Sequence, residues 1–323
     1  MTPMHSYRRR AVCAAILACA ATSAFAWADK PVKLVVPAPP GGVMDVMARV
    51  VGEQLAKDIG QNVIVENKPG AGGGIGMSAV LNAPADGNTL MVTASNVLTE
   101  IPHVMKTAFD PLKDVKPVYA VARVRNLLVS GTAVPAQDFR QLVAYLKAGP
   151  GKYSYASHSP GTASHYAGLF LNNDYGLDLQ HVPFAGAPPA LTQVMSGQIT
   201  VLFDNVITSP PMIAAGKLRA YGIGGSTRNP ALPNVPTFIE LGRPDLDYTN
   251  WFGFVASAKV SDADVERIAR AVQKAAEVPA VRERLVGLGF EIMPPQTPAA
   301  FAQSVRAEYA RNAAIVTKFN VQP

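Results

Sequence analysis

The sequence predicts an α/β protein with two lobes, two crossings of the chain between them, and a ligand cleft. Short apolar runs typical of buried strands alternate with segments whose apolar residues recur at helical spacing, which indicates largely parallel sheets. The 323 residues are enough for two domains of ordinary size. The part after residue 257 contains helices and a single short strand, so we expect it to pack on the first sheet rather than to fold separately.

The first lobe is predicted to begin with a strand, a turn and a helix. VKLVVP (32–37) is a buried strand, and apolar residues at helical spacing follow it until Gly60 ends the helix. Further strands are expected at 62–66, 89–95 and 118–124, with a short helix over 77–82.

The second lobe repeats the alternation. Strands are expected at 127–131, 152–157, 199–203 and 218–224, and helices at 139–146, from Ala163 after a Thr162 cap, at 188–196 and at 211–216. The tail has a strand at 252–257, helices that begin after Ser261 and at Pro279, a strand at 290–293, and a last helix capped by Thr297. Crossings near 124–127 and 247–251 divide the chain into domain 1 (27–125 with 251–323) and domain 2 (126–250).

Residues 1–26 have the pattern of a secretory signal peptide. Three consecutive arginines precede an apolar run, and Ala24-Phe25-Ala26 fits a small-residue cleavage site. Cleavage after Ala28 and lipidation at Cys19 remain alternatives. The pattern predicts export from the cytoplasm.

Removal of that segment changes the chemistry available to the chain. Both cysteines, Cys13 and Cys19, lie in it, so the mature chain has no disulfide, thiolate nucleophile or cysteine metal site. The formal charge falls from +6 to +3, because the segment holds three of the 29 basic residues and none of the 23 acidic ones. No basic run in the mature part indicates nucleic acid binding.

Motifs of enzymes and metal sites are missing from the sequence. There is no G-x-S-x-G or H-E-x-x-H, and His158 and His165 are seven residues apart with no carboxylate or cysteine nearby. We expect no metal and no cofactor. A secreted hydrolase or isomerase that uses Asp45, His165 or Asp204 stays as an alternative hypothesis.

Four glycine-rich segments occur where a strand leads into a helix. They are VPAPPGGVMD (36–45), PGAGGGIG (69–76), YASHSPGTASH (155–165) and HVPFAGAPPA (181–190). The second fails as a dinucleotide motif, because Ile75 stands at the last glycine position and no acidic residue follows at the expected distance. Such junctions line the crevice of open α/β sheets, where helix N-termini favour an anion. The sequence therefore predicts a carboxylate site built from backbone amides.

The same segments, with KYSYAS, GKLRAYGI and LPNVPTFIELG, occur in the order typical of one family. Over about residues 30–320 the chain resembles the extracytoplasmic solute-binding receptors of tripartite tricarboxylate transporters, the Bug receptors. The resemblance implies a periplasmic, two-lobed binding protein of type II that closes on a small organic carboxylate. It also implies delivery to a membrane permease; a receptor domain for a signalling partner is the alternative. We expect a monomer.

The resemblance also implies ligand-binding residues on both lobes. They are Ala38, Gly42, Val43, Asp45, Ala71, Gly72, Ser157, Thr162, Ser164, Ala185, Gly186 and Asp204. The chain departs from the family pattern at Val43, where a small hydroxyl residue is common, at Ser159 for glycine, at Thr162 for serine, and at Phe184 and Ala185, where tyrosine and lysine are common. The loss of a hydroxyl and a cation indicates an aromatic or monocarboxylic acid.

Overall fold

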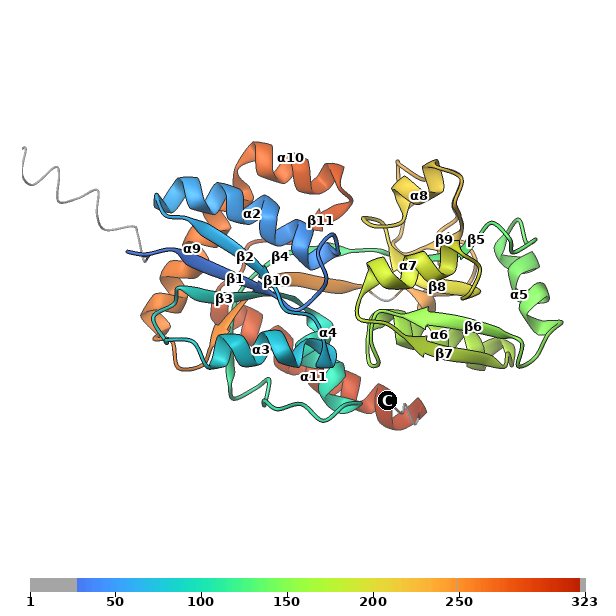
Figure 1. The fold of residues 1–323 in the computed structure, drawn as a ribbon, viewed down its shortest axis with the longest axis horizontal. Coiled ribbons are helices and arrows are strands. Elements are labelled where there is room, and N and C mark those ends of the chain that lie inside the picture. The colour runs from blue at the N-terminus through green and yellow to red at the C-terminus, as the bar shows by residue number, and fades with distance from the viewer. Residues whose placement is uncertain (1–27, 248, 320–323) are drawn as a thin grey trace, which may run out of the picture.

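The computed structural model describes residues 28–247 and 249–319. Two lobes lie end to end along the long axis of the molecule (Figure 1). The predicted signal peptide and both cysteines fall outside the described residues. Among the helices described, none is long and apolar enough to cross a membrane.

The first lobe contains a six-stranded sheet in the order β11-β4-β10-β3-β1-β2. Its strands are β1 (Val32–Val36), β2 (Val63–Asn67), β3 (Thr89–Ala94), β4 (Val115–Val124), β10 (Asn250–Ser257) and β11 (Phe290–Ile292). β1 is parallel to β2 and β3, whereas β10 is antiparallel to β3 and β4, and β11 is antiparallel to β4.

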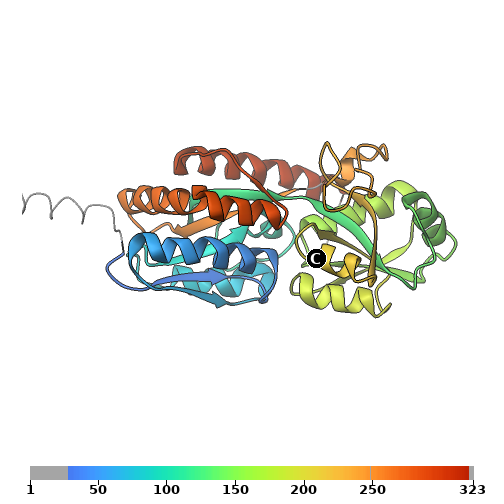
Figure 2. The ribbon, with the colours of Figure 1, turned by 90° about the horizontal axis from the view of Figure 1, so that it is seen from above.

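The strand β1 shows why helices cover both faces of this sheet. Val32 and Leu34 pack into one core with the helices α2 and α9, while Val35 packs on the opposite face with α3 and α11. Buried side chains on both faces are typical of the central strand of a covered sheet. The helices are α2 (Val43–Ile59), α3 (Gly74–Leu81), α4 (Ser95–Thr99), α9 (Asp262–Glu277), α10 (Pro279–Gly287) and α11 (Pro298–Phe319), with the short 3₁₀ turns η2 (Ala71–Gly73) and η3 (Ile101–His103). Figure 2 shows the long helices running beside the strands.

The second lobe contains a five-stranded sheet in the order β7-β6-β8-β5-β9. Its strands are β5 (Asn126–Gly131), β6 (Tyr153–Ser157), β7 (Leu179–Pro183), β8 (Val201–Asn205) and β9 (Leu218–Ile223). Its helices are α5 (Phe139–Lys147), α6 (Ala163–Tyr175), α7 (Ala187–Met195) and α8 (Pro210–Ala214), with a 3₁₀ turn η4 (Pro244–Leu246). Leu128 faces α5 and α6, and its neighbours Leu127 and Val129 face the core that includes α7.

The chain passes between the sheets at two places. β4 ends at Val124 and β5 begins at Asn126, while the return enters the first sheet at Asn250. The two-lobed α/β fold is therefore confirmed. The prediction of largely parallel sheets is wrong, because the return strand β10 and the entry strand β5 run against their neighbours.

Local sequence signals explain most helix ends. Ser261 and Thr297 accept hydrogen bonds from Asp264 and Ala300 backbone amides, as N-cap residues do. Thr162 is an N-cap without a side-chain cap bond; its hydroxyl donates to the Ser159 carbonyl and lies 2.8 Å from the Ser164 hydroxyl. α3 begins at Gly74, earlier than predicted.

Candidate ligand-binding site

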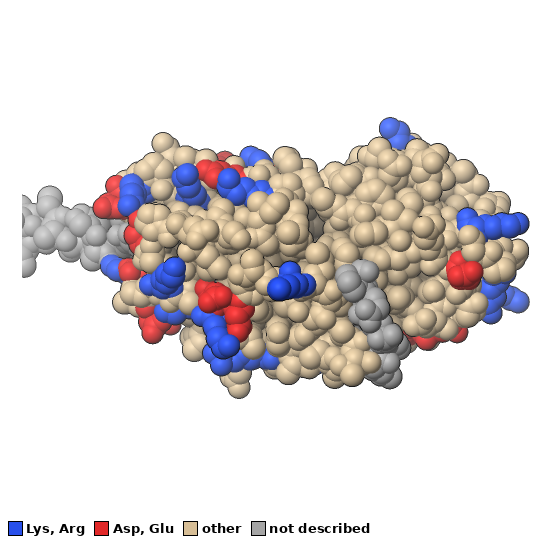
Figure 3. Space-filling view, turned by 60° about the horizontal axis from the view of Figure 1, so that its bottom comes forward, with Lys and Arg blue, Asp and Glu red and all other residues tan. Residues whose placement is uncertain are grey.

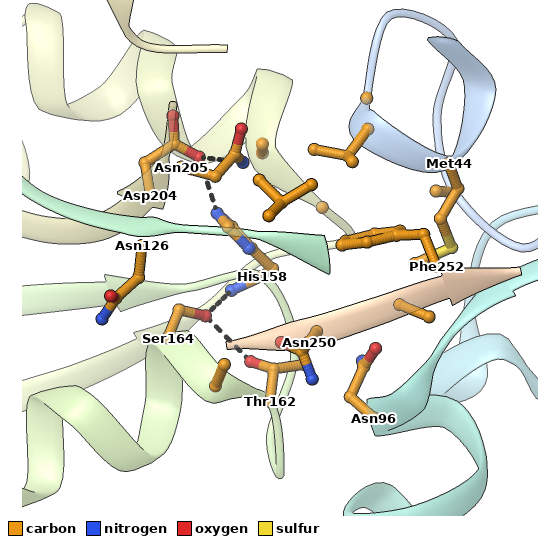
Figure 4. A pocket seen from close by; sticks show the side chains of 18 of the residues that line it. Met44, Asn96, Asn126, His158, Thr162, Ser164, Asp204, Asn205, Asn250 and Phe252 are labelled. Carbon is orange, nitrogen blue, oxygen red and sulfur yellow. Dashed lines mark hydrogen bonds and ion pairs between the residues drawn. The ribbon is translucent and has the colours of Figure 1, made fainter. Parts of the chain in front are cut away.

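A cavity of about 100 Å³ lies between the two lobes. Strand ends and helix starts of both sheets contribute to its wall, and Figure 4 shows the side chains that face it. Its lining residues from the first lobe are Ala38, Pro39, Gly42, Val43, Met44, Ala94, Asn96, Val124, Arg125, Asn250 and Phe252. Those from the second lobe are Asn126, His158, Thr162, Ala163, Ser164, Gly186, Ala187, Pro188, Phe203, Asp204 and Asn205. In the face drawn in Figure 3, charged side chains gather towards the ends of the long axis, and most of the middle is uncharged.

Three helices begin at this cavity, and none has a side-chain cap. The N-caps of α2, α6 and α7 are Gly42, Thr162 and Gly186, and all three line the cavity. The first-turn amides of a helix have no partner within the helix, and its N-terminus carries a partial positive charge. Amides from two lobes are therefore available to one anion without a basic side chain.

Glycine at two positions lets the lobes touch. A Cβ on Gly186, where φ is 113°, would lie 2.8 Å from the Pro39 Cδ atom of the first lobe. A Cβ on Gly161 would lie 3.1 Å from the Cα atom of Ile101. Loops of the second lobe thus contact the first lobe through bare backbone, as in a closed cleft.

Asp45 lies behind the loop that precedes α2 and does not line the cavity. Its carboxylate accepts hydrogen bonds from the Gly41 amide (2.9 Å), from Asn67 (3.0 Å) and from Arg49 (3.0 Å). Burial acts to raise the pKa of Asp45, but these hydrogen bonds outweigh it and lower the pKa. The residue fixes the left-handed turn at Gly41, whose φ is 80°.

The GAGGG segment lines a second hollow of about 270 Å³. Ala38, Met44, Asn96 and Gly186 belong to the walls of both hollows. The second one is completed by Pro37, the segment Gly70–Gly73, Val97, Ile101, Met105, Ser159, Pro160, Pro183, Phe184 and Ala185. Its wall is mainly apolar.

Asp204 is fully enclosed at the second-lobe end of the cavity. Its Oδ1 accepts from His158 Nε2 (3.1 Å) and Asn205 Nδ2 (3.0 Å), and its Oδ2 accepts from the hydroxyls of Thr208 (2.6 Å) and Ser209 (2.5 Å). Four donors fill the usual acceptor positions of a carboxylate. Asp204 therefore orients His158, which is more exposed to the cavity (Figure 4).

Ser157, the last residue of β6, is buried next to the loop 158–162 and contacts one of a pair of stacked histidines. Its hydroxyl lies 2.7 Å from His181 Nε2, and the ring of His181 stacks on that of His165 at 4.0 Å. His165 Nδ1 accepts the Gly161 amide at 3.0 Å. Burial lowers the pKa of His165 to about 3, helped by the neighbouring His181, and burial lowers that of His181 to about 4. Both rings are therefore neutral supports of the loop.

The twelve residues named from the sequence separate into three groups. Seven line the cavity: Ala38, Gly42, Val43, Thr162, Ser164, Gly186 and Asp204. Ala71, Gly72 and Ala185 line the second hollow, and Asp45 and Ser157 line neither.

Sequence reasoning missed four asparagines of the cavity wall: Asn96, Asn126, Asn205 and Asn250. Asn205 ends β8 and Asn96 follows the end of β3, whereas Asn126 and Asn250 are the first residues of β5 and β10. For Asn96 and Asn205 that position was the available signal, since the carboxyl ends of strands line the crevice of α/β sheets. The apolar part of the wall, with Met44 and Phe252, was also missed.

Basic side chains are scarce around the ligand space. Arg125 is the one lysine or arginine among the lining residues of the two hollows in the described chain. Its guanidinium is paired with Glu291 and donates to the Thr227 carbonyl at 2.6 Å. No group of three or more histidine, cysteine, aspartate or glutamate residues within 28–247 and 249–319 could hold a metal ion.

Comparison with known proteins places these features in one family. Residues 47–321 match the model of the tripartite tricarboxylate transporter family receptor. A Pseudomonas protein encoded between tcbD and tcbE is 33% identical over 267 residues, which are 82% of this chain and 80% of that protein. BugT of Bordetella pertussis is 31% identical, over 84% of this chain and 83% of its own length.

Solved structures agree with that match. The periplasmic binding protein BugD is 29% identical with a TM-score of 0.86, and the match covers 91% of this chain and 99% of BugD. MatC from Rhodopseudomonas palustris with bound malate is 31% identical with a TM-score of 0.82, and the match covers 89% of this chain and 99% of MatC. A further R. palustris protein, solved with adipate, is 27% identical with a TM-score of 0.85, and the match covers 92% of this chain and 99% of that protein. The chain thus belongs to the tripartite tricarboxylate transporter receptor family, whose solved members include periplasmic binding proteins.

Proposed function

We propose that this protein is a periplasmic receptor that captures a small organic carboxylate by closure of its two lobes and delivers it to a membrane permease. One observation carries the proposal: three uncapped helix N-termini, from both lobes, begin at one cavity. An anion seated there satisfies amides of both lobes at once, so it favours the closed form. Malate and adipate, found in the structures of two relatives, are also small organic carboxylates.

The proposed closure requires that the chain divides into two rigid lobes. Residues 27–125 with 251–323 form one lobe and residues 126–250 the other, and each moves as a unit about the two crossings. An N-terminal signal peptide exports the chain. The receptor acts as a monomer, because one chain supplies both halves of the cleft.

The ligand proposed for this cleft carries one negative charge. A second carboxylate would meet the enclosed charge of Asp204 and find Arg125 already engaged by Glu291. Phe252, Phe203 and Met44 offer apolar contact instead. A monocarboxylic acid with an aromatic or aliphatic body fits these walls.

Thermal-shift screening of carboxylic acids tests the receptor function. The protein is first unfolded and refolded to remove retained ligand, and each acid is compared with its methyl ester. A free acid at about 100 times its Kd stabilises the protein by about 2.7 kcal/mol, and the uncharged ester lacks this effect. Failure of every acid to raise the melting temperature would refute the receptor function.

Catalysis is not part of the proposed function. The carboxylate of Asp204 is occupied by four donors, and His165 is buried and held by a backbone amide. Incubation with a bound acid should return that acid unchanged by mass spectrometry; turnover that His165→Ala abolishes would favour an enzyme. Uptake of the labelled acid by cells lacking this receptor, restored by the wild-type chain, distinguishes permease delivery from signalling.

A further inference from the structure

The side-chain amide of Asn96 faces the ligand space and has no partner in the described chain. It lies just beyond β3, its residue is 8% exposed, and it belongs to the walls of both hollows. Throughout the described chain, no side chain or backbone group bonds to this amide. An amide that lines a cavity and bonds to no protein group is expected to meet water or a ligand.

Asn250 faces the same cavity from the start of β10 (Figure 4). Its Nδ2 donates to Ser95 Oγ (2.5 Å) and to Glu100 Oε1 (2.9 Å), both on the α4 side. Both protons of the amide are therefore used inside the first lobe. The carbonyl oxygen Oδ1 is the atom that remains for the cavity, and it can only accept.

These two amides define a hydrogen-bonding pattern beside the carboxylate seat. Asn250 requires a donor, and Asn96 supplies a donor as well as an acceptor. An ammonium group could donate to the oxygens of both amides, but it would leave the Asn96 Nδ2 group without an acceptor. A second carboxylate could accept from Asn96 but would place its charge against the oxygen of Asn250. A hydroxyl group can donate to Asn250 Oδ1 and accept from Asn96 Nδ2, so it pairs with both side chains.

We infer that the ligand is a hydroxy-substituted monocarboxylic acid whose hydroxyl group is bound by Asn96 and Asn250. The inference rests on the proposed carboxylate receptor function and names its specificity. The carboxylate lies at the helix N-termini, and the hydroxyl points to the ends of β3 and β10. A ligand without the hydroxyl leaves the Asn96 amide and the Asn250 carbonyl oxygen without this partner in the closed cleft, which is how binding sites reject analogues that lack one polar group.

Calorimetric titration of two matched series tests the inference on the full-length mature protein. Each series contains a parent acid, butanoate or benzoate, with its hydroxy derivatives, an amino derivative and a derivative with a second carboxylate. In at least one series, the best hydroxy acid is expected to bind about tenfold or more tightly than its parent. The amino and dicarboxylate derivatives are expected to bind less tightly than the hydroxy acid.

Asn96→Leu keeps the approximate volume of the side chain and removes its hydrogen bonds. We expect it to reduce the affinity ratio between the hydroxy acid and its parent acid by about tenfold. The matched control is Asn173→Leu, at an exposed position of α6 away from both hollows. It should retain the wild-type preference.

The outcomes separate this inference from the receptor function. Binding of acids in which no hydroxy derivative exceeds its parent, or a dicarboxylate binds most tightly, overturns the inference and leaves the receptor function intact. Asn96→Leu with an unchanged hydroxyl preference overturns the assignment to Asn96. Absence of any carboxylate binding refutes the receptor function itself.

Discussion

Substitution of Gly186 by alanine should weaken ligand binding by obstructing closure. Gly186 belongs to the second lobe, and an alanine Cβ there would lie 2.8 Å from Pro39 Cδ and 3.3 Å from Pro39 Cγ in the first lobe. Favourable carbon contacts lie at about 3.5–4.0 Å, so the methyl group is roughly 1 Å too close. The clash exists only while the lobes touch, whereas the strain of a φ of 113° on alanine is present in the open form also.

The size of the effect follows from the cost of overpacking. Extra methyl groups in well-packed contacts cost about 1–3 kcal/mol. Applied to the closed form alone, this reduces affinity by about 5- to 150-fold. The backbone strain adds about 1–3 kcal/mol to the instability of the unliganded protein. It has little effect on affinity, because both forms carry it.

A double-mutant cycle with Pro39→Ala separates the two effects. Alanine at position 39 lacks Cγ and Cδ, the two atoms that the new methyl group meets. The double variant should therefore regain most of the affinity, measured by calorimetric titration, but should keep the lowered melting temperature of Gly186→Ala. Wild-type affinity in Gly186→Ala, or no recovery in the double variant, would show that this contact does not govern closure.

Three further predictions concern stability, measured by urea unfolding at a series of pH values. Asp45→Asn should lower the free energy of unfolding at neutral pH by about 1–3 kcal/mol. Because the folded pKa of Asp45 is lowered, its contribution is present above about pH 4 and is lost as the pH falls through the folded value, so the two proteins should converge in acid. His165 and His181 have folded pKa values of about 3 and 4, so the unfolded chain binds more protons below about pH 6.5. Each histidine then lowers the free energy of unfolding by up to about 1.4 kcal/mol for each pH unit of acidification. His181→Gln should reduce the slope of the unfolding free energy against pH by the contribution of one proton. An unchanged slope would contradict the lowered pKa of His181. Burial, reinforced by the nearby charge of Glu308, raises the pKa of Glu100 well above its usual value, so stability is lost as the pH rises above about 4.5. Glu100→Gln should therefore gain stability relative to wild type between pH 5 and 8; a constant difference would contradict this origin.

The elements of the fold were predictable where one local property decides them. The run Val32–Val36 is apolar because both faces of β1 are covered, and α2 ends where Gly60 adopts a left-handed conformation with φ of 67°. Strand direction could not be predicted in this way. β10 is antiparallel to β3 because the chain enters it on its return from the second lobe, and no local pattern records that route.

The site was predictable in its backbone and less so in its side chains. Glycines with positive φ, such as Gly41 and Gly186, are visible in sequence because other residues rarely adopt that conformation. Asparagine is common in ordinary turns, so the residue type at position 96 does not mark a binding site. The environment of Asn96 depends on Asn250, which the fold brings to α4 from more than 150 residues away along the chain.

The loop VPAPPGGVMD (36–45) would meet both requirements of the proposed receptor, ligand binding and contact between the lobes. Asp45 holds the Gly41 amide, so the chain turns and α2 begins with its free amides at the cavity. Pro39 lies two residues before that turn. Its Cδ is the nearest atom to a Cβ placed on Gly186, which is the N-cap of α7. In the proposed function, the same few residues therefore position both the anion site and the contact between the lobes. We expect a ligand to bring the amides of α2 and α7 to one anion only when Pro39 lies against Gly186, so that closure and recognition depend on the same geometry.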